Sequence, residues 1–158
     1  MKFGLSPLLL AACLWTGGST KTEMPLRCMI QMVNYDGEGA YIVVGLVDPQ
    51  GEYMDTLYML GDDDEWYYEL EDWWRWFGRA NDSIDGITGP TLGGGERTIL
   101  HFELQEEWLD RGYGLRFETG VENEGYHPRE VLIPLTSDFE QGKHHGEGFI
   151  RYVRLARG

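Results

Sequence analysis

Residues Ala40 to Leu60 read AYIVVGLVDPQGEYMDTLYML, and this stretch decides the fold. Its first part, Ala40 to Asp48, is rich in β-branched residues, which favour strands. Asp48-Pro49-Gln50-Gly51 then places proline and glycine as a tight turn prefers them. Glu52 to Leu60 should therefore return beside the first strand, and the whole stretch predicts a β-hairpin.

Further strands are predicted on both sides of this hairpin. Period-two alternation and short apolar runs between turn residues mark each of them. The predicted segments are Arg27 to Asn34, Glu96 to Leu104, Tyr113 to Asn123, Arg129 to Leu135 and Phe149 to Leu155. Seven or so strands at hairpin spacing predict a mostly β protein, an antiparallel β-sandwich of two sheets, formed by residues 21–158 as a single domain.

One segment, Asp64 to Phe77, has the period of a helix instead. Trp66, Leu70, Trp73 and Phe77 share one face, and Asp62 to Asp64 can cap its N-terminus. We predict an aromatic-rich α-helix inserted into the sandwich, ending at Gly78, with Trp66 and Trp73 in the core. Trp74 and Trp76 lie off this stripe and are candidates for a ligand or partner surface.

The N-terminal residues have the layout of a secretory signal peptide. Met1 and Lys2 precede an almost wholly apolar run from Phe3 to Trp15, which is too short to span a membrane, and a polar cluster ends at Thr20. We predict a signal peptide over residues 1–20 and a periplasmic or extracellular location. Two processing routes remain open: release of a soluble protein, or lipidation at Cys13, since Leu10-Ala11-Ala12-Cys13 resembles a bacterial lipobox. Cys28 is then left without an intramolecular partner and is predicted to be buried.

The charge balance limits the class of partner. The chain has 27 Asp and Glu against 13 Lys and Arg, a net charge of −14. A surface of that net charge repels nucleic acid and anionic lipid heads, so no nucleic-acid partner is predicted. The histidines His101, His127, His144 and His145 lack the spaced partners of a metal site, and no metal is predicted.

The segment Asp85-Gly86-Ile87-Thr88-Gly89-Pro90-Thr91 joins the helix to the later strands, and Gly93 to Gly95 follow shortly after it. A glycine-rich loop lets backbone N–H groups approach an anion closely. The order of residues resembles the acceptor motif for covalent flavin attachment, Asp-Gly-x-Ser/Thr-Gly-Ala-Thr. The competing interpretation is a turn that leaves the helix, because these residue types are common in turns.

The chain also resembles a family of predicted periplasmic proteins catalogued as domain of unknown function 2271. The matching residues are the strands around Val43 to Asp48 and Leu57 to Leu60, the segment Trp66 to Arg75, and the motif from Asp85 to Thr91. The resemblance implies an immunoglobulin-like sandwich and an extracytosolic redox role, with a flavin transferase and membrane redox proteins as partners.

Carried over by position, the resemblance makes Thr91 the acceptor of FMN. Asp85, Gly86, Thr88 and Gly89 become the determinants that the transferase reads. Pro90 departs from the pattern, because alanine is usual there, and it fixes its own φ and removes an N–H.

Two functions follow from these observations. The first is an exported member of a flavin-based electron-transfer system, with FMN attached covalently to Thr91. The alternative is a cofactor-free structural or protein-binding sandwich of the bacterial envelope. No independent catalytic constellation was found in the sequence, so an electron carrier or binding module is expected rather than an enzyme with its own substrate.

Overall fold

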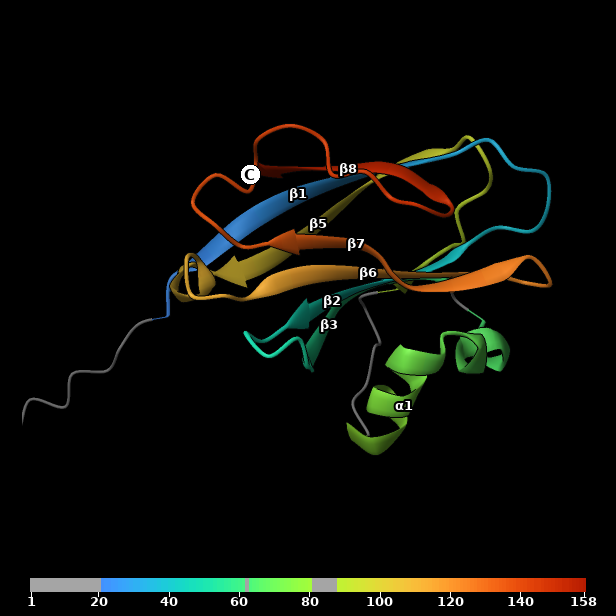
Figure 1. Cartoon of the computed structure of the whole chain (residues 1–158), viewed down its shortest axis with the longest axis horizontal. Coiled ribbons are helices and arrows are strands. Elements are labelled where there is room, and N and C mark those ends of the chain that lie inside the picture. The colour runs from blue at the N-terminus through green and yellow to red at the C-terminus, as the bar shows by residue number, and fades with distance from the viewer. Residues whose placement is uncertain (1–20, 62, 81–87) are drawn as a thin grey trace, which may run out of the picture.

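The computed structural model describes residues 21–61, 63–80 and 88–158. Within them the chain forms a two-sheet sandwich with a short helical layer outside one sheet (Figure 1). The predicted signal peptide, Cys13 and Asp62 lie outside the described residues. The strands are β1 (Glu23–Met32), β2 (Tyr41–Val47), β3 (Tyr53–Leu60), β4 (Thr88–Gly89), β5 (Arg97–Gln105), β6 (Gly114–Val121), β7 (Gly125–Pro134) and β8 (Ile150–Arg157).

The strands form two sheets, and each sheet combines strands that are not consecutive in the chain. The smaller has the order β5-β1-β8 and the larger has the order β4-β3-β2-β6-β7. The predicted hairpin of residues 40–60 forms the antiparallel β2–β3 pair, with Ile42 opposite Leu60. All pairs within the sheets are antiparallel except β3 with the two-residue strand β4, which is parallel.

The main hydrophobic core fills the space between the two sheets. It takes alternate residues from β1, among them Leu26, Cys28 and Ile30, and from the facing strands, such as Leu46 and Phe117. This alternation is the physical reason for the strand pattern in the sequence, because successive side chains point to opposite faces. The predicted β-sandwich is confirmed, and its immunoglobulin-like character stays a prediction.

The predicted helix is present but is interrupted. A 3-10 helix η1 (Asp64–Glu69) and an α-helix α1 (Glu71–Ala80) meet at Leu70, whose backbone is not helical. Asp63 caps η1 as expected for this acidic run, accepting from the Glu65 N–H. Two predictions about this helix were therefore wrong. Trp66, which was expected in the core, is only half-buried, and the helix continues beyond Gly78 to Ala80.

The helical layer packs on the outer face of the five-stranded sheet and creates a second hydrophobic cluster there. This cluster consists of Val43 and Met59 from the sheet and Tyr67, Leu70 and Trp73 from the helical layer. Strand β6 is consequently buried on both faces along its whole length. The fold therefore has three layers: small sheet, large sheet and helices.

Cys28 lies in the main core with no exposed surface, as predicted. Burial raises the pKa of its thiol far above the ordinary value, because a thiolate cannot be solvated there. It is the free cysteine of the described residues. Among these residues no helix is both long and apolar enough to cross a bilayer.

Candidate functional site

The candidate acceptor motif lies only partly within the described residues. Asp85 and Gly86 fall outside them. Thr88 and Gly89 form β4, at the edge of the five-stranded sheet, where Thr88 pairs with Met59 and Gly89 with Leu60. A 2.6 Å hydrogen bond from the Gly61 N–H to the Gly89 carbonyl extends this pairing. The segment that was predicted as a loop therefore contains a short strand.

Thr91 is half-buried and is held from its C-terminal side. The next residue, Leu92, exchanges backbone hydrogen bonds of 2.8 and 3.1 Å with Ala40. The Thr91 side chain lies directly against the backbone of Gly39, where a Cβ would stand 2.4 Å from Thr91 Oγ1. Gly39 is needed for this close approach, and Thr91 has a defined position at the margin of the sandwich.

The three glycines after Thr91 have a different role from the predicted anion-binding loop. The Gly93 N–H donates to the Glu96 carboxylate at 2.8 Å, and the Gly95 N–H donates to the Val33 carbonyl at 2.7 Å. At Gly94 a Cβ would stand 2.1 Å from the Tyr35 carbonyl oxygen. These glycines allow two chain segments to touch, and the N–H groups of Gly93 and Gly95 are already committed to acceptors within the protein.

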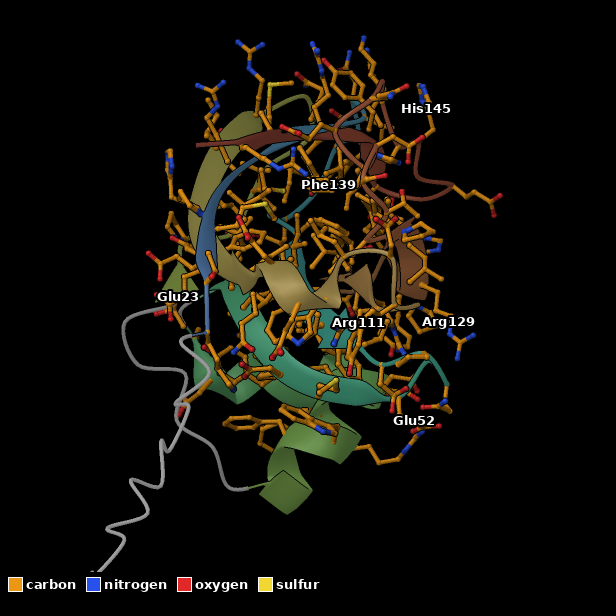
Figure 2. The ribbon with its side chains drawn as sticks, turned by 90° about the vertical axis from the view of Figure 1, so that its left-hand side faces the viewer. Glu23, Glu52, Arg111, Arg129, Phe139 and His145 are labelled. Atoms are coloured by element: carbon orange, nitrogen blue, oxygen red, sulfur yellow. The ribbon has the colours of Figure 1, made fainter. Side chains whose placement is uncertain are left out.

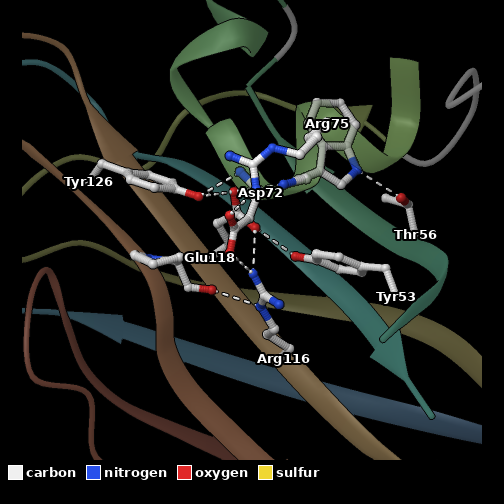
Figure 3. A network of polar contacts seen from close by, with 9 residues as sticks. Tyr53, Thr56, Asp72, Arg75, Arg116, Glu118 and Tyr126 are labelled. Carbon is white, nitrogen blue, oxygen red and sulfur yellow. Dashed lines mark hydrogen bonds and ion pairs between the residues drawn. The ribbon is translucent and has the colours of Figure 1, made fainter. Parts of the chain in front are cut away.

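A second constellation, absent from the sequence prediction, lies under α1. Glu118 on β6 has no exposed side-chain surface. Its carboxylate accepts hydrogen bonds from the Tyr53 hydroxyl at 2.7 Å, the Tyr126 hydroxyl at 2.8 Å and the backbone N–H of Trp73 at 3.1 Å (Figure 3). The Asp72 N–H in turn donates to the Tyr126 hydroxyl at 2.8 Å.

This arrangement caps the N-terminus of α1 with side chains from other elements, the strands β6 and β7. The first N–H groups of an α-helix have no intrahelical partner, and Leu70, which precedes α1, has no side-chain acceptor to offer. Glu118 and Tyr126 supply the missing acceptors for Trp73 and Asp72. A carboxylate at this end also interacts favourably with the helix dipole.

Arg116 joins the same network from β6. Its Nη2 lies 2.8 Å from Asp72 and 3.5 Å from Glu118, and its Nε donates to the Pro128 carbonyl at 2.7 Å. The guanidinium carbon stands 4.5 Å from the centre of the Tyr53 ring, a cation–π contact. Two carboxylates thus compensate one arginine whose side chain is only 5% exposed.

Burial sets the titration of this cluster. Desolvation raises the pKa of Glu118, while its hydrogen bonds and Arg116 act in the opposite direction. Burial, reinforced by the Glu118 charge, also raises the pKa of the Tyr53 and Tyr126 hydroxyls. Both tyrosines therefore stay protonated and continue to donate. Since the carboxylate is enclosed and both of its oxygens accept, the network fixes the helical layer on the sheet.

Among known proteins, the matching family model is described as "Predicted periplasmic protein (DUF2271)", and it matches residues 23–152. The chain belongs to this family. No curated protein and no solved structure gives a significant match. The family description supports an extracytoplasmic location for the chain.

In this family member, the predicted aromatic surface is only partly exposed. Trp73 is buried, and its indole N–H donates to the Thr56 hydroxyl at 2.9 Å. Trp76 is half-buried, with its ring centre 5.8 Å from that of Tyr53, and its role at a ligand or partner surface stays a prediction. Trp74 is 40% exposed, and its role at such a surface likewise stays a prediction.

Two histidines of this family member, His144 and His145, contact backbone carbonyls. His144 Nε2 is 3.0 Å from the Phe139 carbonyl, and His145 Nδ1 is 3.1 Å from the Arg151 carbonyl. Within the part of the chain that the structure describes, no three metal-ligating side chains come together.

The sequence contained one signal for the Glu118 network. Arg116 and Glu118 alternate with Leu115 and Phe117, a pattern that is typical of a strand with one solvated face. The aromatic helix covers apolar residues of β2 and β3, however, and the same sheet face includes Glu118 of β6, which accepts from the Trp73 N–H. A charged pair on a strand that faces an aromatic helix could have indicated a buried polar network.

Proposed function

We propose that this chain is an extracytoplasmic flavin carrier, with FMN attached to Thr91, that relays electrons between membrane redox proteins. The observation that carries the proposal is the position of Thr91. It lies two residues after the end of the edge strand β4, and it is fixed between two backbone pairings, Gly89 with Gly61 and Leu92 with Ala40. An acceptor at a sheet margin can be reached by a modifying enzyme without unfolding the domain.

The residues around Thr91 fit a covalent attachment better than a bound cofactor. A hydroxyl on a half-buried side chain can form a phosphoester with the FMN half of FAD as AMP leaves and the hydroxyl proton is lost. The N–H groups of Gly93 and Gly95 are committed to acceptors within the protein, so they offer no cradle for the phosphate. The covalent bond would therefore have to retain the group, and the phosphate would face solvent.

A second candidate function rests on a different observation. Trp74 and Tyr68 are 40% and 54% exposed on the helical layer, and large aromatic side chains at a surface are typical of protein-binding sites. In this alternative the chain is a cofactor-free binding module of the envelope. The two functions differ in whether Thr91 is modified.

Mass spectrometry of the intact protein tests the proposal. The chain is co-expressed with a flavin transferase in an exporting host, and we expect a yellow protein heavier by one FMN moiety. Thr91→Ala should abolish the added mass, since the attacking oxygen is gone. Thr88→Ala should only weaken labelling, because this residue belongs to β4 and would support the motif. Thr98→Ala changes a half-buried threonine on the other sheet and should have no effect.

Pro90→Ala separates loss of the cofactor from a wrong assignment. Proline restricts the backbone on both sides of the acceptor, and alanine restores the usual motif. If only Pro90→Ala becomes labelled, the wild-type protein has lost the modification and the binding function stands. If neither protein is labelled while a known acceptor is, the flavin proposal is wrong.

A further inference from the structure

The outer face of the three-stranded sheet has no layer above it, and the strand register defines its composition. Side chains directly opposite one another on paired strands share a face. Met29 of β1 lies between Ile99 of β5 and Arg154 of β8. One row along, Arg27 follows Met29 on this face, and Arg97 follows Ile99 in the other direction. We name Arg27, Met29, Arg97, Ile99 and Arg154 the cationic face.

The neighbours of these residues add no negative charge. The remaining positions of the three central rows are Gln31 and Tyr152 beside Arg97, and His101 and Ala156 beside Arg27. Lys143 adds a further cation at the margin, with its ammonium 4.2 Å from the centre of the Tyr152 ring. Acidic side chains return only in the next row, where Glu103 lies opposite Pro25.

The three arginines of the cationic face are free to bind a partner. All three are exposed. Within residues 21–61, 63–80 and 88–158, none of them forms an ion pair. By contrast, the arginine of the helix network, Arg116, is held by Asp72 and Glu118. An uncompensated guanidinium group is well suited to phosphate, which it can bind through two parallel hydrogen bonds.

The centre of the cationic face is apolar and slightly hollow. Ile99 is 51% exposed, and Met29 is half-buried beside it. A shallow hollow of about 260 Å³ lies here, with Arg27 and Arg154 among its lining residues. The face thus combines hydrocarbon at its centre with positive charge around it. An anionic amphiphile matches both features, whereas an acidic protein surface would match only the charge.

The net charge of −14 opposes binding to an anionic surface, but the three rows that hold the arginines contain no acidic side chain. In Figure 2 the three-stranded sheet forms the upper side of the molecule and the helical layer forms the lower side. The exposed acids Asp63, Asp64, Glu65 and Glu71 belong to that far layer. Packed sheets alone are about 10 Å apart. Screening acts over about 8 Å at physiological salt, so the nearby arginines dominate.

From this arrangement we infer that the cationic face docks on an anionic phospholipid surface. Guanidinium groups of Arg27, Arg97 and Arg154 bind headgroup phosphates, while Ile99 and Met29 contact the glycerol and upper acyl region. The binding is weak and dependent on salt, since only three to four basic side chains take part. The inference is independent of the flavin proposal, because it requires no modification of Thr91.

Flotation of protein with large vesicles tests the inference. The chain, purified as an exporting host releases it, is mixed with vesicles of phosphatidylglycerol and phosphatidylcholine or of phosphatidylcholine alone. We expect binding to the anionic vesicles, little binding to the neutral ones, and release at high salt. Arg27→Gln, Arg97→Gln and Arg154→Gln should each lower the partition coefficient about fivefold, the effect of one basic residue near such a surface. Ile99→Ser should weaken binding without changing its dependence on salt.

Arg129→Gln is the matched control. It makes the same change of charge at an exposed arginine, but on β7 of the other sheet, and it should bind as the wild type does. Circular dichroism of each variant verifies that the fold is kept. Equal binding to both kinds of vesicle, no binding to either, or equal loss in Arg129→Gln and the face variants would each overturn the inference. No binding to either kind of vesicle would leave the face to an acidic protein partner.

Discussion

Glu118 shows how one buried carboxylate can hold two layers together. It reaches Tyr53 on β3, Tyr126 on β7 and the backbone of Trp73 at the start of α1. Burial of a charge is costly unless hydrogen bonds and an opposite charge compensate it, and here three donors and Arg116 do so. The helical layer is therefore attached to the sheet by a polar contact as well as by apolar packing.

Glu118→Gln should destabilise the protein by about 1–3 kcal/mol, because the new NH₂ group faces donors and leaves some of them unsatisfied. The loss of stability should be largest at low pH and should become smaller as the pH rises. The pKa of Glu118 is raised in the folded state, so the wild-type side chain stabilises the fold most below its ordinary value of 4.5. This contribution declines as pH rises through the folded pKa. Urea unfolding of both proteins over a pH series measures the difference, and a loss that grows with pH would contradict the raised pKa.

At the scale of one element, α1 presents two neighbouring tryptophans with opposite roles. Trp73 has no exposed surface and stacks on Phe77, with 4.8 Å between ring centres, whereas Trp74 is 40% exposed. Trp73→Ala should cost on the order of 3–5 kcal/mol, as for other buried aromatic residues. Trp74→Ala should cost about 0.5 kcal/mol or less, as surface changes usually do. Chemical denaturation compares them, and similar losses would show that the helix face is assigned wrongly.

The elements also show where prediction from sequence succeeds. The long strands were predicted because the alternation that marks them is local: Leu100 and Leu104 are buried on β5, as their spacing indicates. β1 and β7 begin about four residues earlier than expected, at Glu23 and Gly125, because pairing with neighbours extends them. The edges of strands are therefore less predictable than their centres.

Features fixed by distant contacts could not be predicted. The break at Leu70 and the start of α1 depend on acceptors supplied by Glu118 and Tyr126, which lie far along the chain. The pairing of Thr88 with Met59 requires the chain to return to β3 after the helical insertion. At the candidate site, the sequence indicated a glycine-rich loop around Thr91. The contact of the Thr91 side chain with Gly39 could not be predicted, because these residues are distant in the chain.

For the whole molecule, the excess of acidic residues predicts an effect of salt on stability. A net charge of −14 places like charges close together in the folded state, and this repulsion is relieved when the chain expands. Sodium chloride should therefore raise the melting temperature at neutral pH, since it screens the repulsion. Scanning calorimetry measures the shift. Near the isoelectric point of about 4.5 the same salt should have little effect, and an equal shift at both pH values would point to a different cause.

The burial of Cys28 has a consequence for a protein that works outside the cytoplasm. Oxidants and other thiols react with a thiolate that they can reach, and in the closed sandwich this cysteine is neither ionised nor accessible. Oxidation therefore proceeds only in molecules whose sheets have separated. Where an oxidant is present to take two electrons and two protons, we expect folded copies to stay reduced and copies that open to form disulfide-linked dimers through Cys28. The fraction of disulfide-linked dimers in an aged sample should therefore rise with the frequency at which the two sheets separate.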